Sequence, residues 1–378
     1  MTSYCSRCIM PATKVDLHFD IDGVCDACRS AEAKRSLPWG QRALDFADLC
    51  AWAKAESARR DVAYDCVVPV SGGKDSHYQV HVARKFGLRP LLVSFEPTLP
   101  TNIGKRNLAN LARFADLVQV RKNRDVYAQM CRIAFQEVGD HEWPNHRGIF
   151  VAPVREAVMR CIPLMIWGEN PQLEYGGPHA AARASSVLDR GWLEEFGGML
   201  GLRIDDFIDN HGMDPRDLAL YRYPSMGSDE TRSVFLGYYF PWDAAAHAQL
   251  VRDQMGFEWR KTPVPGAYWP YENLDCASVV HHDYLRYVKY GWSRCDDHLC
   301  AEIRNGRMTR EEAVERSREL GGHYPPEDEV RRLCEFLALS REAYDLVVDS
   351  YTNPALFAAN KAGFLRDGRD LVKKAALA

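Results

Sequence analysis

Residues 71–76 read Ser-Gly-Gly-Lys-Asp-Ser, and this order of small, basic and acidic side chains indicates a phosphate-binding site. An apolar run at residues 66–70 precedes the segment, and a stretch with helical character at residues 77–86 follows it. A strand that passes through a glycine-rich turn into a helix directs backbone N–H groups and the positive end of the helix dipole at one point. The expected phosphate ligands are Ser71, Gly72, Gly73, Lys74 and Ser76, with Asp75 as a magnesium ligand.

This segment is not a Walker A loop, because the G-x-x-x-x-G-K-[ST] spacing is absent. It resembles the PP-loop of the ATP pyrophosphatases, which cleave ATP between the α- and β-phosphates. The alternative is an ordinary Gly-Gly turn, which the neighbouring strand and helix patterns disfavour.

Four cysteines near the start of the chain have the spacing of a structural zinc site. Cys5 and Cys8 form one Cys-x-x-Cys pair, and Cys25 and Cys28 form a second. Four thiolates complete the tetrahedral coordination of Zn²⁺ and leave no open position, so the expected role is structural. An iron–sulfur cluster and two independent redox pairs are the alternatives.

The composition indicates a large protein without a global attraction to nucleic acid or anionic lipid. The chain has 378 residues, a length typical of two or three domains, and a formal net charge of −4. Its apolar runs are short for a membrane span, and the first residues do not have the pattern of a signal peptide. We expect a cytoplasmic protein, in which the 12 cysteines are metal ligands or buried residues.

From residue 65 the pattern alternates between strand and helix. Strands are expected at residues 66–70, 91–95, 117–120 and 163–167, and helices at 77–86, 102–115, 125–138 and 151–160, with Asp125 as an N-cap. Such alternation predicts a parallel sheet covered on both faces, which binds ligands at the carboxyl ends of its strands. Residues 71–76 and Gly168-Glu169-Asn170 both follow strands, so we expect them to share a crevice.

Two polar segments beside the expected crevice admit two readings each. Glu169, Asn170, Glu174 and residues 175–177 are either a solvated loop or ligands of magnesium, ribose or substrate. Residues 141–148 are either a substrate loop or plain surface.

Beyond about Ala180 the alternation stops and the chain is expected to be mainly helical. Thr309 and Glu312 form a capping box, and Ser340 can cap a further helix. Aromatic clusters here are expected in the core, and the mixed charges of residues 294–307 fit a solvated helix face or a site for a sugar or its diphosphate. The predicted division is a four-cysteine zinc-binding segment at 1–35, an ATP-binding domain at 36–185 and a substrate- or partner-binding region at 186–378.

Taken together, the motifs resemble the N-acetyl sugar amidotransferase family, which makes acetamidino sugars for lipopolysaccharide O antigen and flagellin glycans. The resemblance covers essentially the whole chain. One departure is Cys295 with residues 296–300, where smaller residues are expected. The motifs are the cysteine pairs, SGGKDS at 71–76, residues 102–107, GEN…EYGG at 168–177, LGYYFPWD at 236–243, ENLD at 272–275, KYGWSRCDDH at 289–298 and EIRNGRMTREEA at 302–313.

The resemblance implies an α/β PP-loop ATP pyrophosphatase fold (adenine nucleotide α-hydrolase-like) with a zinc-ribbon-like N-terminal segment and a mainly helical C-terminal region. It also implies that ATP activates the acetamido group of a nucleotide-linked sugar as an adenylated imidate, which ammonia converts to an acetamidino group. Ammonia would come from a separate glutaminase, because the chain has no G-x-C-x-G nucleophile elbow. The residues expected to contact ATP, Mg²⁺ or the reacting groups are residues 71–76, Gly168, Asn170 and the catalytic candidates Lys74, Asp75, Glu169, Glu174 and His298.

Two other functions remain open at this point. A zinc knuckle with a PP-loop also resembles tRNA-thiolating enzymes, but these need a basic surface and reactive cysteines. The net charge is −4, and Cys131 and Cys161 lie in patterns that favour burial. A nucleotide-sensing adaptor that docks through its zinc ribbon is the non-enzymatic alternative.

Overall fold

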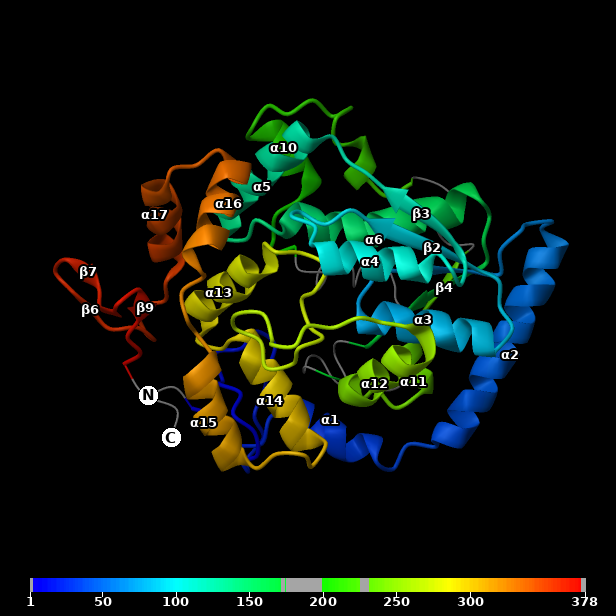
Figure 1. Cartoon of the computed structure of the whole chain (residues 1–378), viewed down its shortest axis with the longest axis horizontal. Helices are drawn as coiled ribbons and strands as arrows, with labels where there is room; N and C mark the ends of the chain where they lie inside the picture. Colours follow the sequence, from blue (N-terminus) through cyan, green and yellow to red (C-terminus); the bar gives the residue numbers. More distant parts are fainter. Residues whose placement is uncertain (1–2, 171–173, 175–198, 225–230, 375–378) are drawn as a thin grey trace.

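The computed structural model describes residues 3–170, 174, 199–224 and 231–374. Within these residues the main sheet has five parallel strands in the order β3-β2-β1-β4-β5. Figure 1 labels β2, β3 and β4 of this sheet. The strands are β1 (Cys66–Pro69), β2 (Pro90–Phe95), β3 (Asp116–Val120), β4 (Leu164–Trp167) and β5 (Arg232–Phe235). The predicted α/β fold with a parallel sheet is therefore confirmed.

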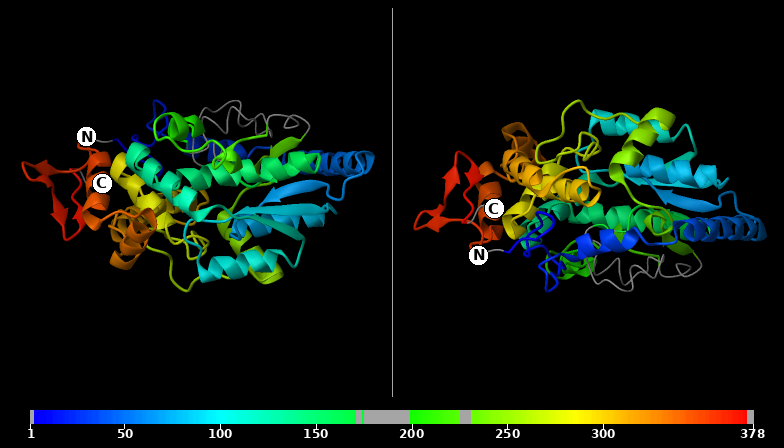
Figure 2. Two further views of the ribbon diagram at one scale, coloured as in Figure 1. Left: turned by 90° about the horizontal axis from the view of Figure 1, so that it is seen from above. Right: turned by 90° about the horizontal axis from the view of Figure 1, so that it is seen from below.

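Helices cover both faces of this sheet (Figure 2). The first part of the chain contains α1 (Asp26–Lys34), α2 (Trp39–Arg59), α3 (Lys74–Lys85), α4 (Asn102–Leu111), α5 (Arg124–Val138) and α6 (Trp143–Met159). The second part contains α10 (Ile204–Asp209), the short η1 (Ala219–Tyr221), α11 (Leu236–Tyr239), α12 (Ala244–Met255), α13 (Val279–Tyr290), α14 (Arg294–Arg304), α15 (Arg310–Leu320), α16 (Glu327–Leu337) and α17 (Arg341–Tyr351). Two small antiparallel pairs follow, β6 (Ala359–Asn360) with β7 (Gly363–Phe364) and β8 (Arg366–Asp367) with β9 (Asp370–Leu371).

Alternate residues of the strands belong to two separate hydrophobic cores, as the two-residue period of a strand requires. In β1, Val67 packs with α5, α6 and the C-terminal helices α13, α16 and α17. Its neighbours Cys66 and Val68 pack with α2, α3, α4 and α12 on the other face. The first core joins the sheet to the C-terminal helices, so the mainly helical region shares a hydrophobic core with the α/β part of the chain.

A third core lies around the N-terminal cysteines. Cys5, Cys8, Cys25 and Cys28 pack with Trp292 and with apolar residues of α14 and α15. Figure 1 shows the N-terminal segment beside these two helices, although they are far apart in the chain. The cysteine segment is therefore packed against the C-terminal helices and shares a hydrophobic core with them.

Several local expectations need correction. Asn123 caps α5, because its side chain accepts from the amides of Asp125 and Val126, and Asp125 lies inside the helix. Residues 141–148 are neither a loop nor exposed surface, because α6 already begins at Trp143 and His141 and Glu142 are buried. The strand β5 was not predicted, since its four residues Arg-Ser-Val-Phe lie far beyond the alternating region. Cys161 is exposed in a turn, whereas Cys131 is buried as expected.

Other local predictions are confirmed. Thr309 and Glu312 form a reciprocal capping box at α15, and Ser340 accepts from the amide of Ala343 at the start of α17.

The mixed charges of residues 294–307 are not a solvated face, because α14 buries Asp296, Asp297, His298 and Glu302. Within the part of the chain described here, no helix combines the length and the apolar character that crossing a membrane requires.

The loop after β1 depends on close approach between backbones. Gly72 has φ +93°, and a Cβ there would lie 2.9 Å from the amide nitrogen of Leu108 in α4. Gly73 has φ −71°, and a Cβ there would meet only the Ser71 hydroxyl, at 3.4 Å.

We predict that Gly72→Ala lowers the free energy of unfolding by about 2–4 kcal/mol, because both the left-handed backbone and the contact with α4 oppose a side chain. Gly73→Ala is the matched control and should cost less than about 1 kcal/mol. Urea unfolding of both variants measures the difference. Equal stabilities would contradict the close approach of this loop to α4.

Candidate active site

The order of the strands places two predicted segments at one point. From β1 the chain adds β2 and β3 on one side of the sheet, and it then returns to add β4 on the other side of β1. The order of strand addition therefore reverses between β1 and β4, although all strands are parallel. Residues 71–76 follow β1 and residues 168–170 follow β4, and parallel sheets bind ligands at such a reversal. In the loop, the Ser71 amide donates to Ser76 Oγ at 2.9 Å and the Gly73 amide to Ser71 Oγ at 3.3 Å. The loop leads directly into α3, whose N-cap is Gly73.

Lys74 is the buried cation of this loop. Its Nζ lies 2.7 Å from Asp75 Oδ2 and forms a second ion pair with Glu272 Oε1. Burial on its own would lower the pKa of Lys74, but the charges of Asp75 and Glu272 raise it above its usual range. Lys74 is therefore a fixed positive charge at the start of α3.

Glu272 joins this loop to the C-terminal half of the chain. Its second oxygen, Oε2, accepts from Arg294 Nη2 at 2.8 Å and lies 3.6 Å from His298 Nε2. Burial on its own would raise the pKa of Glu272, but Lys74 and Arg294 hold it well below its usual range. One ionised, buried carboxylate thus holds three basic groups together.

His298 has a defined tautomer. Its Nδ1 accepts from the backbone amides of Tyr268 and Trp269 at 3.2 and 3.5 Å, so in the neutral ring the proton is on Nε2. The ring stacks on Trp269 with centroids 4.3 Å apart, and burial lowers its pKa. His298 is therefore a neutral imidazole that directs an N–H donor toward Glu272.

A cavity of about 250 Å³ opens beside these residues. One wall comes from α1 and contains Lys34, which binds Glu174 at 2.6 Å. The opposite wall comes from α14, where Arg304 donates to the Glu174 carbonyl at 2.9 Å. The lining residues are Ala27, Ala31, Lys34, Arg35, Trp39, Lys74, Glu169, Glu174, Pro241, Trp242, Ala244, Trp269, Glu272, Asp297, His298, Ala301, Arg304 and Asn305.

Glu169 lies in this cavity after β4. Burial and the negative charge of Asp75 raise its pKa to about 7. A carboxyl group with this pKa can gain or lose a proton at neutral pH.

The cavity therefore gathers most of the predicted site. Lys74, Glu169, Glu174 and His298 all line it, while Asp75 contacts Lys74 at its edge. Gly168 packs between Gln79 and Trp242, and Asn170 is buried. Residues 175–177 lie outside the described residues.

Sequence reasoning did not single out Glu272, Arg294 or Lys34. Glu272 belongs to the ENLD motif and Arg294 to the mixed-charge stretch, so the motifs marked the right segments without the pairing. No motif in the sequence marked Lys34 as a residue of the site, because its partner Glu174 is 140 residues away in the chain.

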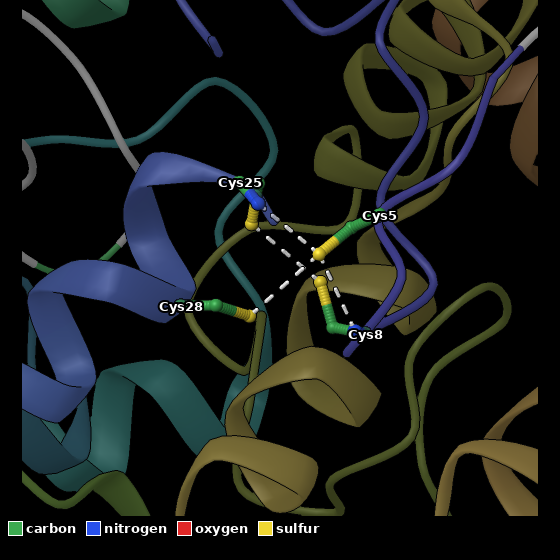
Figure 3. A group of neighbouring side chains, drawn as sticks. All are labelled: Cys5, Cys8, Cys25 and Cys28. Carbon is green, nitrogen blue, oxygen red and sulfur yellow. Dashed lines mark hydrogen bonds between the residues drawn. The ribbon is translucent and has the colours of Figure 1, made fainter. Parts of the chain in front are cut away.

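The four N-terminal cysteines lie close enough to hold one metal ion (Figure 3). All four sulfurs lie within 4.8 Å of one another, with Cys8–Cys25 at 3.7 Å and Cys5–Cys28 at 4.0 Å. Tetrahedral zinc with Zn–S bonds of about 2.3 Å requires sulfurs about 3.8 Å apart. The amides of Arg7, Cys8 and Cys25 point at Cys5 Sγ at 3.2–3.5 Å and would stabilise a thiolate there. The donor set fits structural zinc.

The loop after β1 also fits a nucleotide with Mg²⁺. The loop leads into the N-terminus of α3, and Asp75 Oδ1 is buried without a hydrogen-bond partner among the described residues. A buried carboxylate oxygen of this kind is a suitable ligand for Mg²⁺.

The C-terminal part of the chain is similar to a known protein family. Residues 266–371 match the family model described as "LPS biosynthesis protein WbpG-like, C-terminal domain". In these residues the chain is similar to the C-terminal domain of WbpG-like proteins. Over these residues the match agrees with the resemblance that the sequence motifs predicted, and Glu272, Arg294 and His298 all lie within this WbpG-like region. No curated protein matches the chain.

We predict one zinc ion per chain, because the four buried sulfurs lie within 4.8 Å of one another and supply the four ligands of a structural zinc site. Cys5→Ser should lose the metal and lower stability, since binding to such sites is worth about 10–16 kcal/mol in peptides. Elemental analysis and thermal unfolding of the purified chain measure both effects. Cys50→Ala, a buried cysteine outside the cluster, is the control and should retain the metal. Iron with a visible charge-transfer band would contradict zinc.

Glu169 should make stability depend on pH. A folded pKa of about 7 lies above the usual value of 4.5, so the protonated carboxyl stabilises the fold at low pH and this contribution disappears as pH rises from about 4.5 to 7. Glu169→Gln should remove that slope. We expect the variant to gain about 1–2 kcal/mol relative to the original chain between pH 5 and pH 7.5, allowing for the partial exposure of Glu169. Parallel stability curves in urea unfolding would contradict the raised pKa.

Proposed function

We propose that this protein is an ATP-dependent amidotransferase that converts an acetamido group of a nucleotide-linked sugar to an acetamidino group in lipopolysaccharide O-antigen biosynthesis. The observation that carries the proposal is the ion pair between Lys74 of the phosphate-type loop and Glu272 of the WbpG-like region, beside one cavity. ATP chemistry and sugar recognition would then meet at a single site.

The proposed reaction has two steps. The acetamide carbonyl oxygen attacks the α-phosphorus of ATP, and the bond to the departing pyrophosphate breaks. Ammonia then adds to the imidate carbon, AMP leaves with the former carbonyl oxygen, and one proton is released. The chain positions the reacting groups and supplies charges that stabilise the leaving pyrophosphate. These contributions suffice for transfer of the adenylyl group without a side-chain nucleophile.

Residues 71–76 would hold the pyrophosphate through backbone amides and hydroxyl groups, and Lys74 would neutralise it. Mg²⁺, bound with the help of Asp75, would supply further charge neutralisation. Arg294 lies on the same carboxylate as Lys74 and carries a planar donor fork suited to a phosphate. Gly168 and Asn170 would lie against the nucleotide from β4.

Three residues of the cavity could handle protons and orientation. Glu169 is the best acceptor for a proton from ammonia, since its pKa is raised to about 7. His298 would donate from Nε2 to a developing negative charge. Glu174 is held by Lys34, which favours substrate binding over proton transfer.

Ammonia would come from a separate glutaminase subunit, and the reaction would take place in the cytoplasm. The main rival remains a tRNA-modifying enzyme, which the same assay can detect.

The test measures pyrophosphate and AMP released from ATP with Mg²⁺ and ammonium chloride, using nucleotide-linked acetamido sugars or bulk tRNA as substrates. The proposal predicts release only with a sugar, whose mass falls by the difference between an oxygen atom and an NH group. Release that depends on tRNA would overturn it.

We predict that Lys74→Ala lowers the rate of sugar-dependent pyrophosphate release at least about 10²-fold, because a buried charge that stabilises the leaving group is lost. Lys85→Ala, at the exposed end of the same helix, is the matched control and should retain the rate. Loss of less than tenfold in Lys74→Ala would contradict the role of Lys74.

A further inference from the structure

A second buried polar cluster lies at the carboxyl edge of the sheet, apart from the cavity. It joins the N-terminal end of α6 to the start of α13 and is centred on Glu142, which is 1% exposed. Its members are Asp140, His141, Glu142, Asn145, His146, Ser278 and His282.

Glu142 has one satisfied oxygen and one free oxygen. Oε1 accepts from Ser278 Oγ at 2.6 Å and lies 3.2 Å from His141 Nε2. Oε2 is buried and has no hydrogen-bond partner among the described residues. Burial on its own would raise the pKa of Glu142, but His141 and Ser278 lower it to about 2, so the carboxyl group is ionised.

Other polar atoms around Glu142 are also unsatisfied. Within the described residues, His141 Nδ1, Asn145 Oδ1 and His146 Nδ1 are buried without hydrogen-bond partners. A buried polar atom left unpaired costs about 1–3 kcal/mol. Several such atoms within residues 141–146, at the start of α6, indicate that a small polar ligand belongs there.

The ammonium group of Lys122 does not hydrogen-bond to Glu142 Oε2. Lys122 directs its ammonium group to the carbonyls of Glu96 and Pro97 and over the ring of Tyr127. Asp140, in contrast, is fully engaged, since both of its oxygens contact His282 Nδ1 at 2.9 Å and Oδ1 also accepts from the Glu142 amide. Among the described residues, Glu142 Oε2 is therefore the carboxylate oxygen of this cluster that lacks a hydrogen-bond partner.

We propose that this cluster binds an ammonium ion, with Glu142 Oε2 as its principal acceptor. Ammonium carries one positive charge and four N–H donors, which matches a buried, ionised carboxylate oxygen that lacks a donor. A divalent metal fits less well, because in the described residues the cysteine cluster is the group whose ligand atoms converge closely enough. The assignment rests on the proposed function, in which ammonia is the nitrogen donor.

The cluster is connected to the phosphate loop through residues 272–278. Glu272 at one end contacts Lys74, and Ser278 at the other end contacts Glu142. An extended chain advances at most about 3.6 Å per residue, so these two contacts lie within roughly 22 Å of each other plus the side-chain lengths. One short segment therefore contacts both the proposed ammonium site and the loop that carries Lys74.

Binding can be tested without the reaction. The melting temperature of the full chain is compared in ammonium chloride, potassium chloride and methylammonium chloride at equal ionic strength. We expect ammonium alone to raise it by about 2–4 °C, as a ligand of the folded state does at concentrations well above its Kd. Equal shifts in the three salts would overturn the proposal.

Two isosteric variants identify the residue. Glu142→Gln should lose the shift specific to ammonium, whereas Asp65→Asn, which changes a buried and hydrogen-bonded carboxylate outside the cluster, should retain it. If Glu142→Gln does not fold, the comparison of the three salts on the original chain decides alone. A specific shift that persists in Glu142→Gln would overturn the assignment.

Kinetics distinguish this proposal from the proposed function. With a sugar that supports turnover, Glu142→Gln should raise the KM for ammonium at least about tenfold and leave the KM for ATP unchanged. An unchanged KM for ammonium would overturn the site. Absence of any sugar-dependent turnover in the original chain would overturn the proposed function, and the salt comparison would still decide on ammonium binding.

Discussion

A carboxylate that is almost completely removed from water must be compensated by cations, and Glu272 meets this requirement from two directions. One oxygen binds Lys74 from the loop after β1, and the other binds Arg294 at the start of α14. Leaving such a charge unpaired costs about 3–5 kcal/mol, so neither half of the chain can move away from the other without penalty. This constraint explains why the phosphate-type loop and the WbpG-like region share one cavity.

Other parts of the molecule support this junction. The cysteine segment packs on α14 and α15 and extends α1 along the cavity, where Lys34 fixes Glu174. On the opposite side, the backbones of residues 274 and 275 lie against Gly104 in α4, and α4 lies against Gly72 of the loop. A metal at the cysteines would therefore order a cavity wall as well as its own segment.

The sequence predicted the features that depend on local spacing. The loop at 71–76, the four cysteines, four strands of the sheet and the cap at Thr309 all follow from neighbouring residues. It could not predict β5, because a four-residue edge strand depends on pairing with β4. It also misread residues 141–148, since a polar stretch looks exposed unless its partners, Ser278 and His282, are known to lie beside it. The pairing of Lys74 with Glu272 spans 198 residues and was equally invisible.

A double-mutant cycle between Lys74→Met and Glu272→Gln tests the central constraint most directly, with urea unfolding as the readout. If Glu272 joins the two halves through Lys74, the two changes together should cost less than the sum of the single changes, with a coupling energy of at least about 1 kcal/mol. Additive effects, with a coupling energy near zero, would mean that the two side chains are not paired in solution and would contradict this account of the site.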